Sequence, residues 1–204
     1  MKNSEKFWSK LSYNPKKALD QPSTTQDYGN IRKYLSESDC LLDFGCGNGV
    51  TDIHLANYVK KIVGIDTSAG TIETANSNLD YSKIKNCSFY KMSLSNEALT
   101  KKYNAVLTMS VLQYIEDLEG TIQRISEILV HDGYFISTAA YVGESSSLTI
   151  KIIQSMSKLG VIPNIYSRKV SDITRLIEIA GLELVEMTLI SKKYSEYLVV
   201  ARKL

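Results

Sequence analysis

Short apolar runs alternate with helical patterns along most of this chain, and this alternation limits the possible folds more than any other feature of the sequence. Five such runs lie near 39–44, 61–65, 87–91, 105–109 and 134–138. Strands that are separated by helices are typical of βαβ units, which build a parallel sheet with helices on both faces. The sequence therefore predicts a doubly wound α/β fold.

Two of the intervening segments carry a clear helical period. Apolar residues recur three and four positions apart between 118 and 129 and again between 170 and 180. Each segment therefore has one apolar stripe that can pack against a sheet. Asp117 precedes the first segment as an expected N-cap, and Gly181 follows the second as a stop signal.

The order of elements changes after the second of these helices. The runs "LELVEMTLI" at 182–190 and "YSEYLVVAR" at 194–202 both have a strand-like composition, and only "SKK" separates them. Parallel strands need a crossover of about a dozen residues or more, so we expect this last pair to be antiparallel. The full prediction is a seven-stranded, mostly parallel sheet that ends in a C-terminal antiparallel hairpin.

The length of the chain and the even spread of its apolar residues favour a single domain over residues 1–204. Two segments fall outside the alternation. Residues 1–35 carry scattered aromatic and basic side chains and are expected to form an N-terminal cover with a short helix. Residues 141–167 are expected to form an inserted helical flap.

The bulk composition argues against several classes of function. There are 24 basic and 22 acidic residues, with a net charge of +2, so no nucleic-acid partner is expected. The N-terminus is polar and no apolar run approaches the roughly 18 residues that span a bilayer, so we expect a cytoplasmic protein with no membrane partner. Three cysteines without CxxC spacing and two distant histidines argue against a metal site or a disulfide framework.

The segment "DFGCGNG" at 43–49 places three glycines directly after the first apolar run. In an open parallel sheet, ligands bind beyond the carboxyl ends of the strands. Gly45 and Gly47 lack a Cβ atom and let a ligand touch the main chain, whereas Gly49 lets the next helix pack closely. The second run then ends in Asp66, about 20 residues further on, where a carboxylate can accept hydrogen bonds from both hydroxyls of a ribose. Together these features predict a site for a nucleoside-bearing ligand.

The glycine spacing distinguishes between such ligands. A dinucleotide fingerprint GxGxxG needs glycine or alanine at position 50, where this chain has Val50, and no GxxxxGK[ST] phosphate loop occurs. The chain instead has an acid, Asp43, followed by GxGxG. In this motif it resembles the class I S-adenosylmethionine-dependent methyltransferases, over about residues 36–203 and most closely the small-molecule methyltransferases. The resemblance implies a Rossmann-like methyltransferase fold and S-adenosyl-L-methionine as cofactor, with S-adenosyl-L-homocysteine as product.

The resemblance also implies roles for residues of the first two motifs. Asp43 matches the acid that lies near the amino group of the methionine part, and Gly45 and Gly47 would line the cofactor with their backbone. Asp66 matches the ribose-binding acid. Thr67 follows it and either contacts the adenine or caps the next helix, and both alternatives are open.

Later motifs match the family less closely. Ser93 stands where the family often has an acid that contacts the adenine amino group, so the hydroxyl of Ser93 or the backbone of Leu94 is expected to take that contact. Met109, at the end of the fourth run, would lie beside the methionine part. Near the N-terminus, Tyr13 is a candidate either to close over the cofactor or to anchor the N-terminal helix to the core.

Methyl transfer from a sulfonium is an in-line displacement, which needs donor and acceptor aligned about 3–3.5 Å apart and no protein nucleophile. A general base matters only for an acceptor that must lose a proton. Many relatives have Glu-His where this chain has Gln113 and Tyr114, so a histidine base is missing there. Tyr114 is a weak catalytic candidate, which either orients the acceptor or packs. The N-terminal cover and the flap are expected to form the acceptor pocket.

The leading hypothesis is a methyltransferase that acts on a small molecule, whose identity and methylated atom the sequence does not indicate. A methyltransferase acting on a macromolecule is one alternative, although the chain lacks an [ND]PP[YF] run after the fourth strand. A protein that binds S-adenosylmethionine without transferring its methyl group is a second, which Ser93 and the Gln113–Tyr114 pair keep open. A nicotinamide-dependent oxidoreductase would have to bind a dinucleotide despite Val50.

Overall fold

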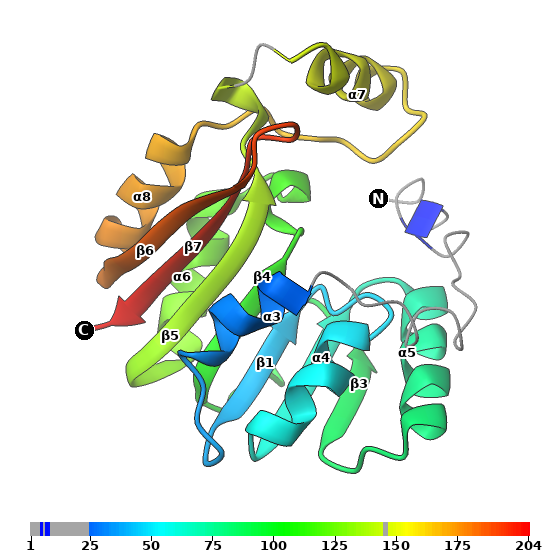
Figure 1. Ribbon diagram of the computed structural model, residues 1–204, viewed down its shortest axis with the longest axis vertical. Coiled ribbons are helices and arrows are strands. Elements are labelled where there is room, and N and C mark those ends of the chain that lie inside the picture. Colours follow the sequence, from blue (N-terminus) through cyan, green and yellow to red (C-terminus); the bar gives the residue numbers. More distant parts are fainter. Residues whose placement is uncertain (1–4, 6, 9–24, 145–146) are drawn as a thin grey trace. The chain divides into compact units, whose positions relative to one another are not determined.

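A computed structural model gives the structure of residues 5, 7, 8, 25–144 and 147–204 (Figure 1). The chain divides into two compact units, Met1–Leu107 and Thr108–Leu204. One strand, β4, continues from the first unit into the second. No helix among the described residues combines the length and the apolar character that a membrane span requires.

The elements of the first unit follow the predicted alternation of strands and helices. In chain order they are α3 (Thr25–Arg32), β1 (Cys40–Phe44), α4 (Val50–Leu55), η1 (Ala56–Tyr58), β2 (Lys61–Asp66), α5 (Ala69–Ser82), β3 (Cys87–Lys91) and most of β4 (Tyr103–Met109).

The second unit holds the remaining helices and the closing hairpin. In chain order its elements are η2 (Leu112–Tyr114), α6 (Leu118–Ile128), β5 (Leu129–Ala140), η3 (Val142–Glu144), α7 (Leu148–Lys158), α8 (Val170–Ile179), β6 (Leu182–Ser191) and β7 (Glu196–Lys203).

The seven strands form one sheet in the order β3-β2-β1-β4-β5-β7-β6. β1 pairs in parallel with both β2 and β4, and β2 pairs in parallel with β3. β7 is antiparallel to both β5 and β6, because the short connection between β6 and β7 leaves no room for a crossover. The predicted mostly parallel sheet with a C-terminal antiparallel hairpin is therefore confirmed.

β1 lies in the core with both of its faces covered. Leu41 and Leu42 have no exposed surface, and Phe44 is 9% exposed. Burial on both faces explains why this strand has a continuous apolar run in the sequence instead of an alternating pattern. Asp43 interrupts the run and is nevertheless buried, which is costly for a carboxyl group without a partner.

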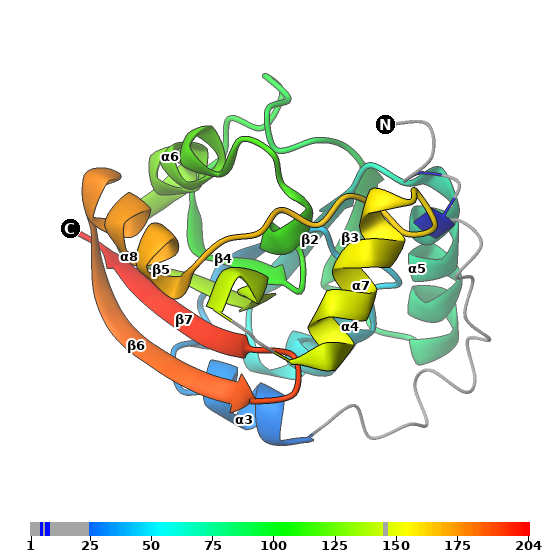
Figure 2. The same cartoon turned by 90° about the horizontal axis from the view of Figure 1, so that it is seen from above.

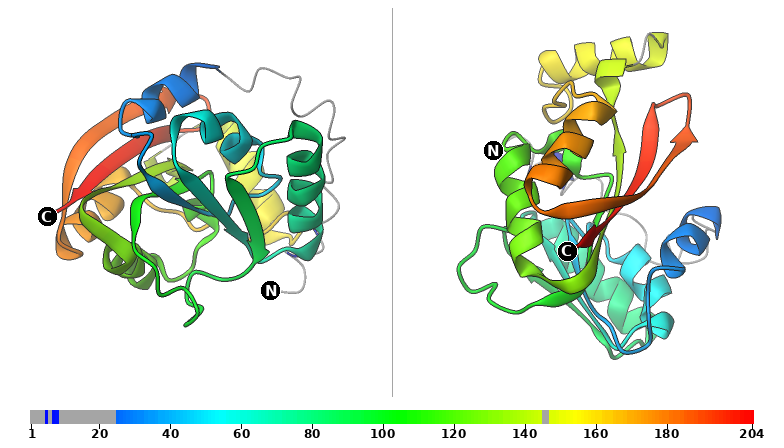
Figure 3. Two further views of the ribbon diagram at one scale, coloured as in Figure 1. Left: turned by 90° about the horizontal axis from the view of Figure 1, so that it is seen from below. Right: turned by 90° about the vertical axis from the view of Figure 1, so that its left-hand side faces the viewer.

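Both helices predicted from the apolar period are present. Asp117 is the N-cap of α6, and its Oδ1 accepts a hydrogen bond from the backbone N–H of Gly120 at 2.9 Å. Gly181 follows α8 with a φ of 72°, the left-handed conformation that commonly ends a helix. Within the second unit α8 lies along β6 (Figures 2 and 3).

β5 is longer than predicted. The sequence indicated a strand near 134–138, whereas β5 spans Leu129–Ala140. The polar residues His131 and Asp132, before the predicted run, are part of the strand. Asp132 has a φ of 62° within the bounds of the strand. Exposed polar residues at the start of a strand carry no apolar alternation, so the sequence pattern placed its beginning too late.

The two segments outside the alternation are described in part. Within 141–167, α7 buries Ile150 but leaves Leu148 and Ile152 largely exposed, by 73% and 54%. Of the expected N-terminal cover, α3 is described, and Ile31 at its end is buried. Tyr13 lies outside the described residues.

Gly49 connects the turn after β1 to α4 at a crowded position. Its φ is 71°, and a Cβ atom there would lie 2.5 Å from Cζ of Phe89 on β3. The absence of a side chain therefore lets the start of α4 approach a buried aromatic ring. This is the packing role considered for Gly49 from the sequence.

We expect Gly49→Ala to lower the free energy of unfolding by about 2–4 kcal/mol, because the methyl group overlaps the Phe89 ring in a left-handed conformation. Gly47→Ala is the matched control, since its φ is 53° but a Cβ there would meet no atom within 4 Å. It should cost only the conformational term of about 1–2 kcal/mol. Denaturant unfolding of both variants measures the difference, and equal losses would contradict the packing role.

Candidate functional site

The glycine turn after β1 is fixed at the carboxyl end of β2. The backbone N–H groups of Gly45 and Cys46 donate to the carbonyl oxygen of Ile65 at 2.8 and 3.1 Å. The N–H of Gly47 donates to Oδ2 of Asp66 at 3.2 Å. The carboxylate predicted to bind a ribose therefore lies against the glycine turn.

Other groups orient the Asp66 carboxylate as well. Oδ1 accepts a hydrogen bond from the N–H of Ser68 at 2.8 Å, and the hydroxyl of Thr71 donates to the same oxygen at 3.5 Å. The side chain is half-buried, and both of its oxygens are held by donors from fixed parts of the backbone and of α5. A carboxylate positioned in this way can accept further hydrogen bonds without reorganising.

Ser68, and not Thr67, is the N-cap of α5. Oγ of Ser68 accepts a hydrogen bond from the N–H of Thr71 at 3.4 Å. The capping alternative considered for Thr67 is therefore wrong, because its neighbour takes that role. Thr67 is exposed, and its contact with adenine stays a prediction.

Asp43 is a buried acid directly ahead of the turn. It is 1% exposed, and its Oδ1 accepts no hydrogen bond. Burial raises the pKa of Asp43 above its ordinary value, hydrogen bonding with Asp52 opposes this increase, and the negative charge of Asp66 adds to it. A carboxyl group in such surroundings becomes a favourable partner for a cation.

Asp52 on α4 is a residue that the sequence analysis missed. It has no exposed surface, and neither of its oxygens accepts a hydrogen bond. Burial raises its pKa well above the ordinary value, and the negative charge of Asp43 raises it further. A signal was available in the sequence, because Val50, Ile53 and Leu55 of the same six-residue helix are apolar. A short helix with apolar residues on most of its faces has little polar face on which an acid could lie in solvent. The burial of Asp52 follows from this feature and not from a single apolar stripe.

The expected adenine contacts follow β3. In the parallel pairing of β2 with β3, Asp66 is opposite Lys91, so Ser93 follows two residues beyond that position. Ser93 is exposed, with its Oγ 3.0 Å from Oγ of Ser95, and Leu94 is 5% exposed. The first unit therefore brings most of the predicted cofactor residues to the carboxyl ends of β1, β2 and β3: Asp43, Gly45, Gly47, Asp66, Thr67, Ser93 and Leu94.

These residues fit an adenosyl ligand with a cationic amino group. A side chain on Gly47 would meet no atom within 4 Å, so the main chain of the turn is open to a ligand. Asp66 offers two positioned acceptor oxygens to a pair of hydroxyls. Asp43 has a buried oxygen without a hydrogen-bond partner, which a protonated amino group would satisfy.

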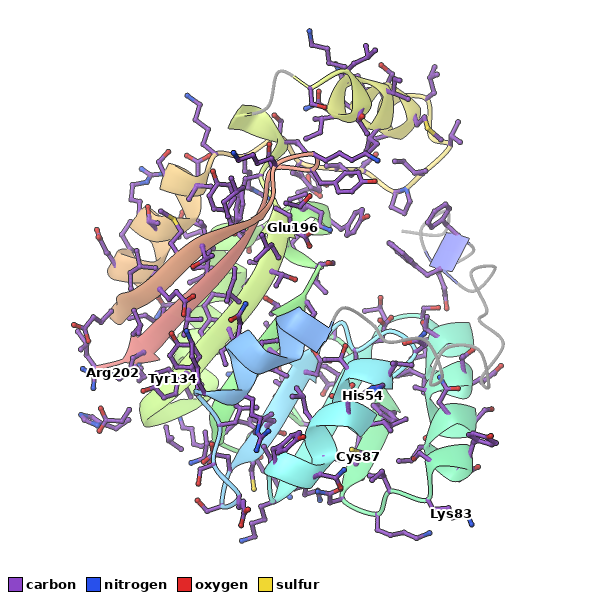
Figure 4. The ribbon with its side chains drawn as sticks, viewed as in Figure 1. His54, Lys83, Cys87, Tyr134, Glu196 and Arg202 are labelled. Atoms are coloured by element: carbon purple, nitrogen blue, oxygen red, sulfur yellow. The ribbon has the colours of Figure 1, made fainter. Side chains whose placement is uncertain are left out.

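In the second unit, the chain turns sharply where β4 ends. Ser110 has a φ of 57°, and its N–H donates to the carbonyl oxygen and to Oγ1 of Thr138 at 2.8 and 3.1 Å. Its hydroxyl donates to Oε1 of Glu196 at 3.4 Å, and Glu196 lies at the start of β7 (Figure 4). Left-handed residues other than glycine are strained and often occur at functional sites. Met109, predicted to lie beside the cofactor, is the residue before this turn and is half-buried.

Arg168 fixes the loop that follows and was also missed from the sequence. Its guanidinium donates to the carbonyl oxygens of Leu112 and Glu116 at 3.3 and 2.7 Å and lies 5.1 Å from the centre of the Tyr166 ring. Backbone carbonyls have no residue-type signature, and these two are more than 50 positions away along the chain. No sequence pattern could therefore have indicated the contact.

Tyr114, the weak catalytic candidate, is half-buried in this loop. Burial raises its pKa, and hydrogen bonding with Gln113 lowers it by less. A phenol whose pKa lies above its ordinary value stays protonated at neutral pH. Tyr114 is therefore suited to donate a hydrogen bond and unsuited to act as a general base.

A family model described as a methyltransferase domain matches residues 35–189 of this chain. The chain therefore belongs to this family of methyltransferase domains. The predicted resemblance to the class I S-adenosylmethionine-dependent methyltransferases is confirmed.

Curated relatives include enzymes with different acceptors. An uncharacterized methyltransferase of Schizosaccharomyces pombe is 28% identical over 213 aligned residues, which cover 95% of this chain and 80% of that protein. A ubiquinone biosynthesis O-methyltransferase of Pelagibacter ubique is 34% identical over 48% of this chain. A 23S rRNA (uracil-C5) methyltransferase of Vesicomyosocius okutanii is 35% identical over 36% of it. The aligned region covers only 41% of the Pelagibacter ubique protein and 18% of the Vesicomyosocius okutanii protein. Another uncharacterized methyltransferase of Schizosaccharomyces pombe is 28% identical over 54% of this chain and 42% of that protein.

Two solved structures with the same fold cover nearly all of the chain. The N-methyltransferase NodS of Bradyrhizobium japonicum, in complex with S-adenosyl-L-homocysteine, has a TM-score of 0.72 and 18% identity, with 98% of each chain covered. A putative methyltransferase in complex with the Trm112 methyltransferase activator of Haloferax volcanii has a TM-score of 0.76 and 17% identity, with 97% of this chain and 96% of that chain covered. Similarity at this level of identity shows the fold.

The buried acids of the first unit make stability depend on pH. The pKa values of Asp43 and Asp52 are raised in the folded protein, so the folded chain binds more protons than the unfolded chain above about pH 4. The stability contributed by the protonated pair is full below about pH 4 and is lost as the pH rises through the raised folded-state values.

We expect Asp52→Leu to raise the free energy of unfolding by about 1–3 kcal/mol at about pH 8, because an apolar group of similar size replaces a buried acid without a positive partner. The gain should be smaller at about pH 5, because the penalty for holding a proton that the unfolded chain releases grows as the pH rises above about 4. Denaturant unfolding at the two pH values measures it. Asp80→Asn on the exposed face of α5 is the control, and an equal gain at both pH values would contradict the proton linkage.

Proposed function

We propose that this chain binds S-adenosyl-L-methionine in its first unit and transfers the methyl group to a small-molecule acceptor by in-line displacement. The observation that carries the proposal is the contact between the carboxylate of Asp66 and the N–H of Gly47, at 3.2 Å. This contact joins the two elements that an adenosyl ligand needs, an open glycine turn and a carboxylate for the ribose.

The residues of the first unit hold and orient the cofactor in this proposal. Asp66 accepts hydrogen bonds from the ribose hydroxyls, and Asp43 receives the positively charged amino group of the methionine part. Gly45 and Gly47 line the ligand with their backbone, and Thr67, Ser93 and Leu94 lie on the adenine side. Met109 and the aromatic Tyr13 complete the proposed contacts. When bound, S-adenosylmethionine supplies a methyl group that its sulfonium makes electrophilic.

The second unit is proposed to face the acceptor through the loop after β4. Arg168 fixes the backbone of this loop through Leu112 and Glu116, so groups on the loop have defined positions. Tyr114 can donate a hydrogen bond that orients the acceptor, since its raised pKa keeps it protonated. Positioning of this kind supplies most of the rate enhancement when no protein nucleophile takes part.

Two observations support a small acceptor over a macromolecule. The near balance of charge, with a net charge of +2, offers no electrostatic footprint for a nucleic acid. The relative from Pelagibacter ubique is named for ubiquinone biosynthesis, although another relative is named for rRNA. RNA therefore belongs among the acceptors to be tested.

Ligand-dependent thermal melting tests the cofactor. S-adenosylmethionine and S-adenosylhomocysteine should each stabilise the chain, by about 2.7 kcal/mol at about 100 times the dissociation constant, and NAD should not. A shift with NAD alone would overturn the cofactor assignment.

Substitutions of Asp66 test the carrying observation. Asp66→Ala should abolish the stabilisation by S-adenosylhomocysteine. Asp66→Asn is the sharper variant, because its amide oxygen can keep the contact with Gly47 while the charge and the second acceptor oxygen are lost. We expect it to weaken S-adenosylhomocysteine by about 10- to 100-fold in calorimetry, the value of a hydrogen bond to a charged group. Unchanged affinity in Asp66→Asn would contradict the proposed role.

Transfer of labelled methyl groups tests the reaction itself. The panel should contain small hydroxyl, amine and carbon acids, together with RNA and protein from a cell extract. We expect label in a small molecule. Label in RNA or protein would support the macromolecular alternative, and tight cofactor binding with no transfer to any acceptor would support a binding protein without activity.

A further inference from the structure

Asp43 and Asp52 form a buried pair of acids, and the proposed function uses only one of them. They are 1% and 0% exposed. Oδ1 of Asp43 and both carboxyl oxygens of Asp52 accept no hydrogen bond. A hydrogen bond joins the side chains of Asp43 and Asp52, so the two groups are in contact. Three buried acceptor atoms without a donor would be a large cost if both groups were carboxylates.

The neighbouring strands add no positive charge to this pair. β2 contributes a third acid, Asp66, whose negative charge also acts on Asp43. The glycine turn contributes the buried thiol of Cys46. From β3, the thiol of Cys87 donates to the backbone oxygen of Asp52 at 3.7 Å. Burial raises the pKa of both thiols, so both are neutral.

The polar and charged groups named here on the neighbouring helices contact other partners. Asn78 on α5 is a neutral amide, and its Nδ2 donates to the backbone oxygen of Asn48 at 2.8 Å. On α3, the guanidinium of Arg32 lies 3.9 Å from the centre of the Tyr58 ring. On α4 itself, His54 places Nδ1 2.7 Å from the backbone oxygen of Val50; His54 and Cys87 are marked in Figure 4. Within the described part of the chain, no ion pair involves either acid.

One proton resolves this arrangement. A carboxylate only accepts hydrogen bonds, whereas a protonated carboxyl group also donates one. A proton on Asp52 makes Asp52 a hydrogen-bond donor to Asp43 and removes one of two negative charges from a buried space. The reverse placement, with the proton on Asp43, would leave no anion at the end of β1.

We propose that Asp52 keeps its proton and donates a hydrogen bond to Asp43, which holds Asp43 as the anion that receives the amino group of the cofactor. Asp52 is thus a positioning residue that acts through Asp43, and this role rests on the proposed function. It also links cofactor binding to protons. Below the pKa of Asp43, the free protein carries a proton on each acid.

The proton balance of binding follows from this assignment. When a ligand with a protonated amino group binds, Asp43 loses its proton to the solvent, and its carboxylate pairs with the ammonium group. Asp52 keeps its O–H bond and donates to Asp43, and no other bond forms or breaks. Binding should therefore release up to about one proton per ligand at low pH and none at high pH. Affinity should rise with pH over the same range.

Calorimetry of S-adenosylhomocysteine in two buffers of different ionisation enthalpy measures this proton release. Two substitutions separate hydrogen bonding from packing. Asp52→Leu keeps the side-chain volume and removes the hydrogen-bond donor, so we expect the affinity to fall by about tenfold or more near pH 7. The pH range over which the affinity increases should also shift to higher pH. Asp52→Asn keeps a donor, so its affinity should stay within about threefold of the wild type. Asp80→Asn is the surface control.

A merely structural role for Asp52 makes the opposite prediction. Under the proposal, Asp52→Leu binds S-adenosylhomocysteine more weakly although it is more stable than the wild type at alkaline pH. Under a merely structural role, weaker binding would result from damage to the fold and would come with lower stability. Infrared spectroscopy adds a direct readout, since the wild type should show the band of a protonated carboxylic acid that Asp52→Asn lacks at alkaline pH.

The outcomes separate this inference from the proposed function. If the wild type does not bind S-adenosylhomocysteine, the proposed function fails. If the wild type binds it, but Asp52→Leu binds equally well with the same pH dependence and the same proton release, the proposed function stands and the role of Asp52 is refuted. Equal weakening in Asp52→Leu and Asp52→Asn would likewise refute donation to Asp43.

Discussion

The parallel pairing of β1 with β2 is the constraint on which the proposed site depends. Phe44 lies opposite Ile65 in this ladder, and the next two N–H groups of the chain donate to the carbonyl oxygen of Ile65. The glycine turn therefore leaves the sheet directly beside Asp66, whose carboxylate accepts the N–H of Gly47. Because side chains on this turn would separate a ligand from the main chain, the absence of Cβ atoms is what turns a strand connection into a binding surface.

The acids near this turn show how function and stability oppose each other. A buried carboxyl group without a positive partner destabilises the folded state as the pH rises, and the chain keeps two of them, Asp43 and Asp52, within a well-packed region. The same desolvation strengthens the attraction of an anion for a cationic ligand. The burial that lowers the stability of the free protein therefore also supplies the proposed affinity for the cation. Binding sites commonly keep groups that reduce stability because binding requires them.

The loop after β4, in the second unit, is fixed in a different way. No glycine turn follows β4; Ser110 takes the left-handed conformation instead, and Thr138 fixes its N–H with two acceptors. Arg168 then holds the loop by two backbone carbonyls. A loop fixed through its backbone leaves its side chains free to differ between proteins, and the relatives of this chain are named for functions as different as ubiquinone biosynthesis and rRNA methylation.

The sequence by itself determined the α/β class, the antiparallel end of the sheet and the approach of Asp66 to the glycine turn, because these depend on local period, connection length and the position of strand ends. It placed the start of β5 too late and left the cap of α5 as one of two open roles for Thr67, since polar residues at element ends have weak signals. Only the tertiary structure decided that Asp52 is buried beside Asp43 and that Arg168 holds the loop after β4. The Arg168 contact ends on backbone carbonyls, which have no signature in the sequence. The apolar neighbours of Asp52 on α4 indicate burial of this acid but not its contact with Asp43, which lies on another element.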